Sequence, residues 1–177
     1  MVRRARKKCE KVLGDDHPYT LICLTLLADI LRFERQYEAA ELAYRHVLDV
    51  REKVLGEDPP DTLGSVYSLA FLLQGQGKYD IAEEMSYRAL KGYKATLGDE
   101  HPWTLSSLQC LASVRQSQRK YKEAEEISRQ ALTGFEETLR ADHPFTLTSL
   151  QGLATILQSL GKYQAAEECD GRIDAKV

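Results

Sequence analysis

The sequence predicts an all-α protein, a superhelical solenoid in which antiparallel helix pairs stack side by side. Three observations carry this prediction. A block of residues recurs every 42 positions, the apolar residues inside each block have helical spacing, and glycine or proline stands where each helical stretch should end or begin. A period of this length is typical of repeat proteins, in which each unit packs mainly on its neighbours.

The repeat is clearest in one loop. Residues 13–21 read LGDDHPYTL, and the same block returns as LGEDPPDTL, LGDEHPWTL and LRADHPFTL, always after 42 residues. Three further columns keep the same step: Ala28, Ala70, Ala112 and Ala154; Ala40, Ala82, Ala124 and Ala166; Tyr37, Tyr79, Tyr121 and Tyr163. Columns that stay in phase over the whole chain indicate one continuous array.

Each unit begins with a helix, called helix A. In the first copy Leu21, Leu24, Leu27 and Leu31 lie on one face because they recur at helical spacing. The proline that precedes this stretch in every copy fits the first turn of a helix, where its missing N–H is not needed. Helix A should end near residue 35, because the second and fourth copies have glycine there, which favours the left-handed conformation of a helix end.

A second helical stretch, called helix B, completes each unit. In the first copy it runs from about Glu38 to Leu55 and ends at Gly56, in a glycine column. The two alanine columns fit positions where helices cross at roughly 8–10 Å, since a larger side chain would force them apart. One such hairpin cannot bury its apolar face alone, so the units must stack.

We expect residues 1–177 to form a single array. Its expected parts are an orphan helix B at 1–13, full repeats at 17–55, 59–97 and 101–139, and a partial terminal repeat at 143–177. The first part is an orphan because residues 1–13 align with residues 43–55. The basic run from Arg3 to Lys11 is interpreted as a solvated helix face, with a contact to nucleic acid or anionic lipid as the alternative.

Composition narrows the class of protein. The net charge of −3 gives no overall reason to bind nucleic acid, and no apolar run is long enough to span a bilayer. The N-terminal residues do not resemble a signal peptide, so we expect a cytoplasmic protein without membrane contact. The four cysteines are widely scattered, which favours reduced thiols over a disulfide framework.

The columns also match a known family. Leu69-Ala70, Tyr79, Ala82 and Ala89-Leu90 resemble the small, aromatic and alanine positions of the tetratricopeptide repeat, and the 42-residue step with its LGDEHP loop is similar to the kinesin-light-chain-like subclass. This resemblance implies a right-handed superhelix whose A helices line a concave surface. It also implies a protein–protein interaction scaffold, belonging to a larger adaptor or receptor protein, with no cofactor.

The resemblance indicates which A-helix columns face the concave surface. We expect a peptide-binding groove lined by Thr25, Asp29, Arg32, Tyr67, Phe71, Gln74, Gln109, Gln116, Gln151 and Gln158. Charged residues are rare in these columns, although 29% of the chain is charged. Amide and hydroxyl side chains suit the polar backbone of an extended peptide.

Two alternatives to this groove stay open. The glutamines could serve only to solvate the concave face or to bond the neighbouring hairpin. The array could also have a structural role, stacking on copies of itself as a homo-oligomer or on neighbouring domains, because each end of a solenoid leaves a repeat face open.

The loop residues have their own candidate roles. The aromatic column Tyr19, Trp103 and Phe145 is interpreted as a set of staples that close each loop onto the preceding helix B, with interface anchors as the alternative. The histidines at 17, 101 and 143 each take the same place in their own repeat, so those in neighbouring repeats should lie roughly 10 Å apart, which is too far for shared zinc ligands. We therefore assign them a structural role.

No catalytic pattern stands out. The sequence has no phosphate-binding glycine loop and no nucleophile elbow, so we expect neither an enzyme nor a metal site. The pairs Glu83-Glu84, Glu125-Glu126 and Glu167-Glu168 recur with the repeat and are interpreted as a solvated helix face. Cys110 is interpreted as a packing residue.

Overall fold

The structure is a computed structural model that describes residues 11–175. Its A helices are α2 (Pro18–Phe33), α4 (Pro60–Gly75), α6 (Pro102–Ser117) and α8 (Pro144–Ser159), and its B helices are α3 (Tyr37–Leu55), α5 (Tyr79–Leu97), α7 (Tyr121–Thr138) and α9 (Tyr163–Asp174). Residues 11–13 are also helical, while the rest of the expected orphan helix and most of the basic run lie outside the described residues.

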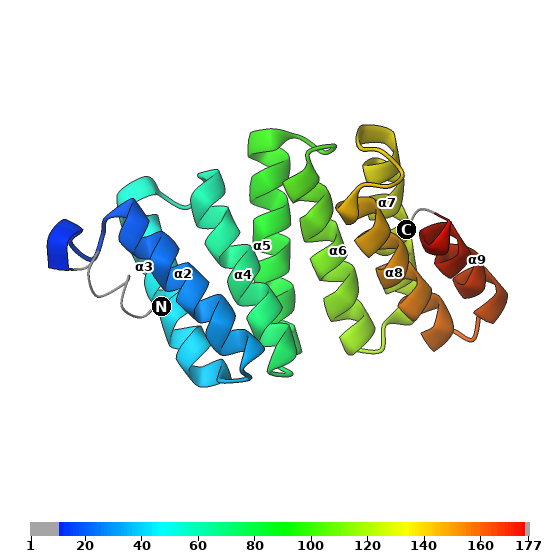
Figure 1. Ribbon diagram of the computed structural model, residues 1–177, viewed down its shortest axis with the longest axis horizontal. Coiled ribbons are helices and arrows are strands. Elements are labelled where there is room, and N and C mark those ends of the chain that lie inside the picture. The colour runs from blue at the N-terminus through cyan, green and yellow to red at the C-terminus, as the bar shows by residue number, and fades with distance from the viewer. Residues whose placement is uncertain (1–10, 176–177) are drawn as a thin grey trace.

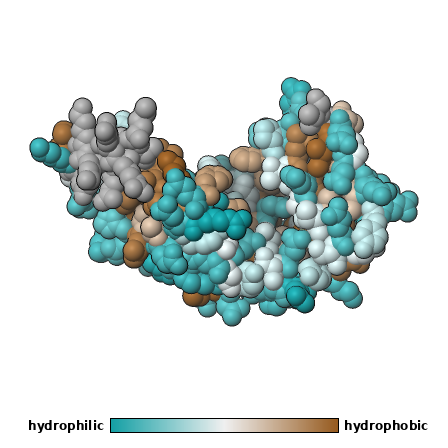
Figure 2. Space-filling model, turned by 60° about the horizontal axis from the view of Figure 1, so that its bottom comes forward, coloured by the Kyte–Doolittle hydropathy of each residue, from teal (hydrophilic) through white to brown (hydrophobic). Residues whose placement is uncertain are grey.

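The helices stack in chain order along the long axis of the molecule (Figure 1). Each A helix runs antiparallel to the B helix that follows it, and each hairpin packs on the next. This is the predicted all-α solenoid. Figure 2, turned by 60° from the view of Figure 1, shows that the surface is hollowed between the two ends of the molecule.

The loop histidines begin the A helices. The Nδ1 atoms of His17, His101 and His143 each accept a hydrogen bond at 3.2 Å from the backbone N–H two residues further on. These N–H groups have no partner inside the helix, so the imidazole caps the first turn. The predicted structural role of the histidines is confirmed. In α4 the same position is Pro59, and no side chain caps that helix.

Each A helix ends in the left-handed conformation at the same repeat position. Gly77 and Gly161 have φ values of 78° and 73°, and the arginines of the other two copies, Arg35 and Arg119, have 59° and 63°. In every copy the next backbone N–H bonds back across the end of the helix, for example from Gln36 to the carbonyl five residues earlier. This is a Schellman-type end, and it reverses the chain into helix B.

The alanine columns lie where the sequence placed them. All eight of these side chains are at most 2% exposed, and they fill the places where helices cross. The core therefore runs along the stack between A and B helices, leaving the concave and convex faces free to carry other residues.

A repeated polar contact joins successive hairpins. Glu41 on α3 accepts hydrogen bonds at 2.8 Å from Lys78 and from Gln76, which lie at the turn of the next hairpin. Glu83 takes the same place one repeat later, and Glu125, which is 9% exposed, accepts from Lys162 at 2.6 Å. The interpretation of Glu83 and Glu125 as solvated carboxylates is therefore wrong.

A second repeated contact joins the loops to the preceding helix B. Trp103 stacks on Tyr93 with ring centroids 6.2 Å apart, and Phe145 packs on Phe135 at 5.8 Å. In the second copy of the loop Arg51 occupies the Tyr93 position and donates to the backbone carbonyl of Asp61 at 2.8 Å. For Tyr19 the equivalent helix B position is residue 9, which lies outside the described residues, so the staple there stays a prediction. The aromatic column thus acts as the predicted staple where its partner is aromatic, and an arginine replaces that contact where it is not.

Candidate binding groove on the concave face

Two neighbouring hollows lie on the concave face. The first, of about 250 Å³, is formed by α2, α3 and α4, and the second, of about 340 Å³, is formed by α4, α6 and α8. Tyr67 and Phe71 line both hollows and separate them. The predicted groove is therefore divided by an aromatic wall, which we call the Tyr67–Phe71 wall.

The first hollow holds the two charges of the predicted groove. Asp29 accepts a hydrogen bond from the hydroxyl of Tyr44 and lies 3.9 Å from the guanidinium of Arg32. That guanidinium lies 4.5 Å from the ring centroid of Phe33 and 5.0 Å from that of Phe71. Contact with two aromatic rings holds Arg32 in place by cation–π attraction.

Sequence reasoning missed Tyr44, which comes from a B helix. The equivalent positions in the other repeats are Ser86, Ser128 and Asp170. A tyrosine in a column of small or acidic residues is the sequence signal that could have identified it as part of the site. Tyr44 is 1% exposed, and burial together with the carboxylate of Asp29 raises the pKa of its hydroxyl. It therefore stays protonated and keeps donating to Asp29.

The second hollow carries no formal charge. Its polar lining includes Gln109, Gln116, Gln151 and Thr148. Gln109 is positioned by Ser149, which donates to its side-chain oxygen at 3.1 Å. Glutamine and threonine offer both donors and acceptors, so this hollow can pair with an uncharged polar group such as a peptide backbone.

The side chains of Gln74 and Gln116 bond the next A helix, which limits the hydrogen-bonding groups that they can offer to a ligand. The side-chain nitrogen of Gln74 donates to the hydroxyls of Ser113 (2.6 Å) and Ser117 (3.0 Å) on the next A helix. Gln116 repeats the contact with Ser159 at 3.4 Å. Because both N–H groups of Gln74 are used, only its carbonyl oxygen is left for a ligand.

The remaining predicted positions differ in how free they are. Thr25 is half-buried and donates to a carbonyl of its own helix at 2.9 Å. Gln151 and Gln158 are exposed, and their side chains form no hydrogen bond with another described residue. Peptide binding by these residues stays a prediction.

The hydroxyl of Tyr67 is the most informative group in the groove. The side chain is half-buried, and burial raises the pKa of the hydroxyl, so the group stays protonated. No other residue in the range 11–175 forms a hydrogen bond with it. The hydroxyl is not one of the enclosed polar atoms without a partner, so it reaches the surface of the wall between the two hollows and can donate to a ligand.

Cys110 lies beside the second hollow but is 3% exposed. Burial raises the pKa of its thiol to about 11, and a contact with the Ser86 hydroxyl offsets only part of this effect. A thiol that stays protonated is a poor nucleophile, so packing is the role that fits. Within residues 11–175, no cluster of histidine, cysteine and acidic side chains is arranged to hold a metal ion.

Known proteins place the chain in a family. A model of the tetratricopeptide repeat matches residues 1–53, 62–132 and 104–172, which together span most of the sequence. The chain belongs to the tetratricopeptide repeat family. Arrays of this family generally serve as protein-interaction scaffolds. No curated protein sequence matches the chain.

Solved structures agree with this tetratricopeptide assignment. The kinesin-light-chain-type, nearly identical TPR-like repeats of Podosopora anserina are 28% identical, with a TM-score of 0.74 over 99% of this chain and 83% of that one. BtubC (BKLC) from P. vanneervenii is 18% identical, with a TM-score of 0.79 over 99% of this chain and 70% of that one. Aspartyl phosphate phosphatase F from Bacillus subtilis is 16% identical, with a TM-score of 0.80 over 99% of this chain and 44% of that one. The last two show the fold alone.

Within the part of the chain that the structure describes, no helix has the length and apolar character needed to cross a membrane.

Proposed function

We propose that this tetratricopeptide array binds an extended segment of a partner protein in its concave groove, across the Tyr67–Phe71 wall. The observation that carries the proposal is the unpartnered, protonated hydroxyl of Tyr67 between two hollows. An extended peptide has backbone carbonyls that can accept from this hydroxyl. Its side chains can enter the hollows on either side.

The two hollows differ in the side chains that they suit. The first offers aromatic surface from Phe71 and a guanidinium held beside it. The second offers only uncharged donors and acceptors. Side chains two positions apart point to the same side of an extended chain. A segment with a polar uncharged residue and, two positions away, a residue that accepts hydrogen bonds from Arg32 would therefore satisfy both hollows. We place the array in a larger adaptor or receptor protein, where the groove would recruit this segment.

A displayed library of random peptides, selected on the intact chain, supplies a ligand for the test. Tyr67→Phe removes only the hydroxyl and should weaken the selected peptide by roughly threefold to tenfold, the worth of one hydrogen bond. Phe71→Ala removes the wall and should weaken it by about tenfold or more. Affinity is measured by fluorescence anisotropy, and circular dichroism checks that the helices are kept.

Tyr163 supplies the matched control. It is an exposed tyrosine at the first position of α9, outside both hollows. Tyr163→Phe and Tyr163→Ala should leave the affinity unchanged. If the selected peptides bind the Tyr67→Phe and Phe71→Ala variants as tightly as the original chain, the groove is not the binding site.

A further inference from the structure

The B helices on the convex face are tied to one another at two of the three junctions that residues 11–175 contain. Arg88 on α5 pairs with Glu52 on α3 at 2.6 Å, and Arg172 on α9 pairs with Glu136 on α7. These pairs occupy equivalent repeat positions. Each holds one B helix against the next across the A helix that lies between them.

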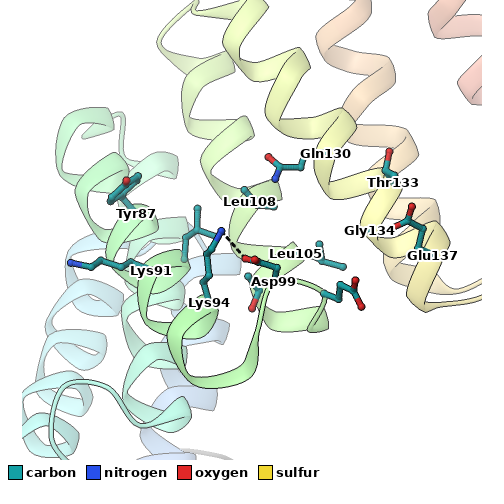
Figure 3. A pocket seen from close by; sticks show the side chains of 13 residues that line it. Tyr87, Lys91, Lys94, Asp99, Leu105, Leu108, Gln130, Thr133, Gly134 and Glu137 are labelled. Atoms are coloured by element: carbon teal, nitrogen blue, oxygen red, sulfur yellow. Dashed lines mark ion pairs between the residues drawn. The ribbon is translucent and has the colours of Figure 1, made fainter.

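The middle junction, between α5 and α7, lacks this tie. Its equivalent positions hold Lys94 and Gln130, which cannot form an ion pair. Lys94 instead pairs at 2.8 Å with Asp99, in the loop that follows its own helix. Figure 3 shows Lys94 and Asp99 pointing toward each other, with Gln130 on the helix across the opening.

An open cavity of about 640 Å³ lies at this junction, and we call it the α5–α7 cleft. Its apolar lining includes Leu90, Leu105 and Leu108. Leu90 and Leu108 are half-buried here, whereas their repeat equivalents are buried: Leu48 and Leu132 for the first, and Leu24, Val66 and Leu150 for the second. The junction without a tie thus uncovers side chains that belong to the core in the other repeats.

The charges around the cleft are unequally paired. Lys94 is neutralised by Asp99, but the carboxylates of Glu100 and Glu137 have no ion-pair or hydrogen-bond partner within residues 11–175. Lys91, on the α5 side, also lacks a partner in that range. Two free carboxylates therefore lie on the loop and α7 side of an apolar cleft, and their complement is a cation next to an apolar side chain.

We propose that the α5–α7 cleft is a second protein-binding site, which takes a basic amphipathic segment of a partner. An apolar side chain of that segment covers Leu90 and Leu108, and an arginine or lysine meets Glu100 and Glu137. The cleft opens between α5 and α7 onto the outer side of α6 and the loop before it, and it shares no lining residue with the two hollows of the groove. The array can therefore hold two partner segments at once.

Two synthetic peptides test the chemistry of the occupant. Both carry leucine on one helical face, and the charged positions are all arginine in one and all glutamate in the other. Two-dimensional NMR of the labelled chain should show shifts at Leu90, Leu105 and Leu108 with the arginine peptide, and about tenfold weaker binding of the glutamate peptide. Equal binding of both peptides, no binding of either, or shifts confined to the concave residues would overturn the proposal.

A charge reversal tests the rim. Glu137→Lys should weaken the arginine peptide by about tenfold. Glu126→Lys is its control, because Glu126 is an exposed, unpartnered residue of the same helix outside the cleft, and the variant should bind as the original chain does. If Glu137→Lys binds the arginine peptide as tightly as Glu126→Lys does, the carboxylates of the cleft do not contact the peptide, which contradicts the proposal.

A second pair of substitutions tests the opening itself. Lys94→Glu together with Gln130→Arg recreates the arrangement of Glu52 and Arg88, so it should tie α5 to α7 and weaken the arginine peptide by tenfold or more. Circular dichroism should stay unchanged. Undiminished binding by this folded double variant would contradict the proposal.

Competition separates this site from the groove. A peptide selected for the concave groove should not displace the arginine peptide, and Tyr67→Phe should leave arginine-peptide binding unchanged. Displacement, or a loss of binding in Tyr67→Phe, would mean that both ligands use the groove and that the cleft is not a separate site.

Discussion

Gly92 on α5 shows how close the two helices of one hairpin come. A Cβ atom at this position would lie 2.4 Å and 2.8 Å from the two methyl carbons of Leu63, a residue that is 1% exposed. We predict that Gly92→Ala lowers the free energy of unfolding by about 1–3 kcal/mol, because overpacking outweighs the better helix propensity of alanine. Urea unfolding followed by circular dichroism measures the change.

Gly171 is the control for this substitution. It also lies inside a helix, α9, but a Cβ atom there would meet no other atom within 4 Å. Gly171→Ala should therefore raise the free energy of unfolding by about 0.5–1 kcal/mol. A destabilisation of similar size in both variants would mean that the contact with Leu63 is not the cause.

At the scale of single residues, the sequence predicted roles set by local geometry better than roles set by a neighbour. The alanine columns and the histidine caps follow from the period and from helix ends. Glu125 was misassigned because recurrence every 42 residues looked like a solvated face. A residue that docks each hairpin on the next recurs with the same step, so the period alone cannot separate the two roles.

Between elements, the contact of Glu41 with the next hairpin makes the stability of the fold depend on pH. Burial opposes its ionisation, but hydrogen bonds from Lys78, Gln76 and Arg45 outweigh burial and lower the pKa of Glu41 from 4.5 to about 2. The bond to Lys162 likewise lowers the pKa of Glu125, against the opposing effect of burial. Above about pH 4.5 both carboxylates are ionised in the folded and unfolded chains alike, so their full stabilisation is present there.

Below that pH the unfolded chain takes up protons first, so stability falls until the folded Glu41 is protonated near pH 2. We predict that Glu41→Gln lowers the thermal midpoint at pH 7 and flattens its fall between pH 4.5 and 2. Differential scanning calorimetry across this range measures both effects. Glu84→Gln, at an exposed carboxylate on α5, should change neither. An unaltered pH profile in Glu41→Gln would show that the contact adds no pH-dependent stability.

Helix boundaries were predictable from sequence because caps and turns are local. The groove was only partly predictable. Its columns follow from the repeat, but its division into two hollows depends on Tyr44 from helix B and on the aromatic pair at 67 and 71. The cleft between α5 and α7 was not predicted, because it arises from a missing ion pair that only a comparison of three junctions in space reveals.

Over the whole molecule, the first described helix A and the last described helix B do not carry the complementary groups that join neighbouring hairpins. On α2, Ile30 is 40% exposed, although its repeat equivalents Leu72, Val114 and Ile156 are buried. An apolar face of this kind favours a contact. In a second copy stacked head to tail, however, Glu167 would meet Glu34 and Gln36 at the positions that hold Gln76 and Lys78 for Glu41.

We therefore predict that the chain is monomeric near neutral pH, because head-to-tail stacking would bring two carboxylates together without a lysine. Sedimentation velocity over a concentration series should give a constant sedimentation coefficient after correction for non-ideality. A coefficient that rises with concentration would instead support the homo-oligomer, and its loss on Ile30→Lys would place the contact on α2.

The contacts between loops and B helices make the hairpins only partly interchangeable. Removing one 42-residue unit, from position 57 to position 98, keeps every helix and turn in phase, yet it brings Arg51 against Trp103 in place of its own loop. The joint at Arg51 is thus matched to its own loop, whereas a joint of Tyr93 with Phe145 would keep an aromatic pair. Gene-level shuffling of these units would therefore need a compensating change only at joints that separate Arg51 from the loop of Asp61.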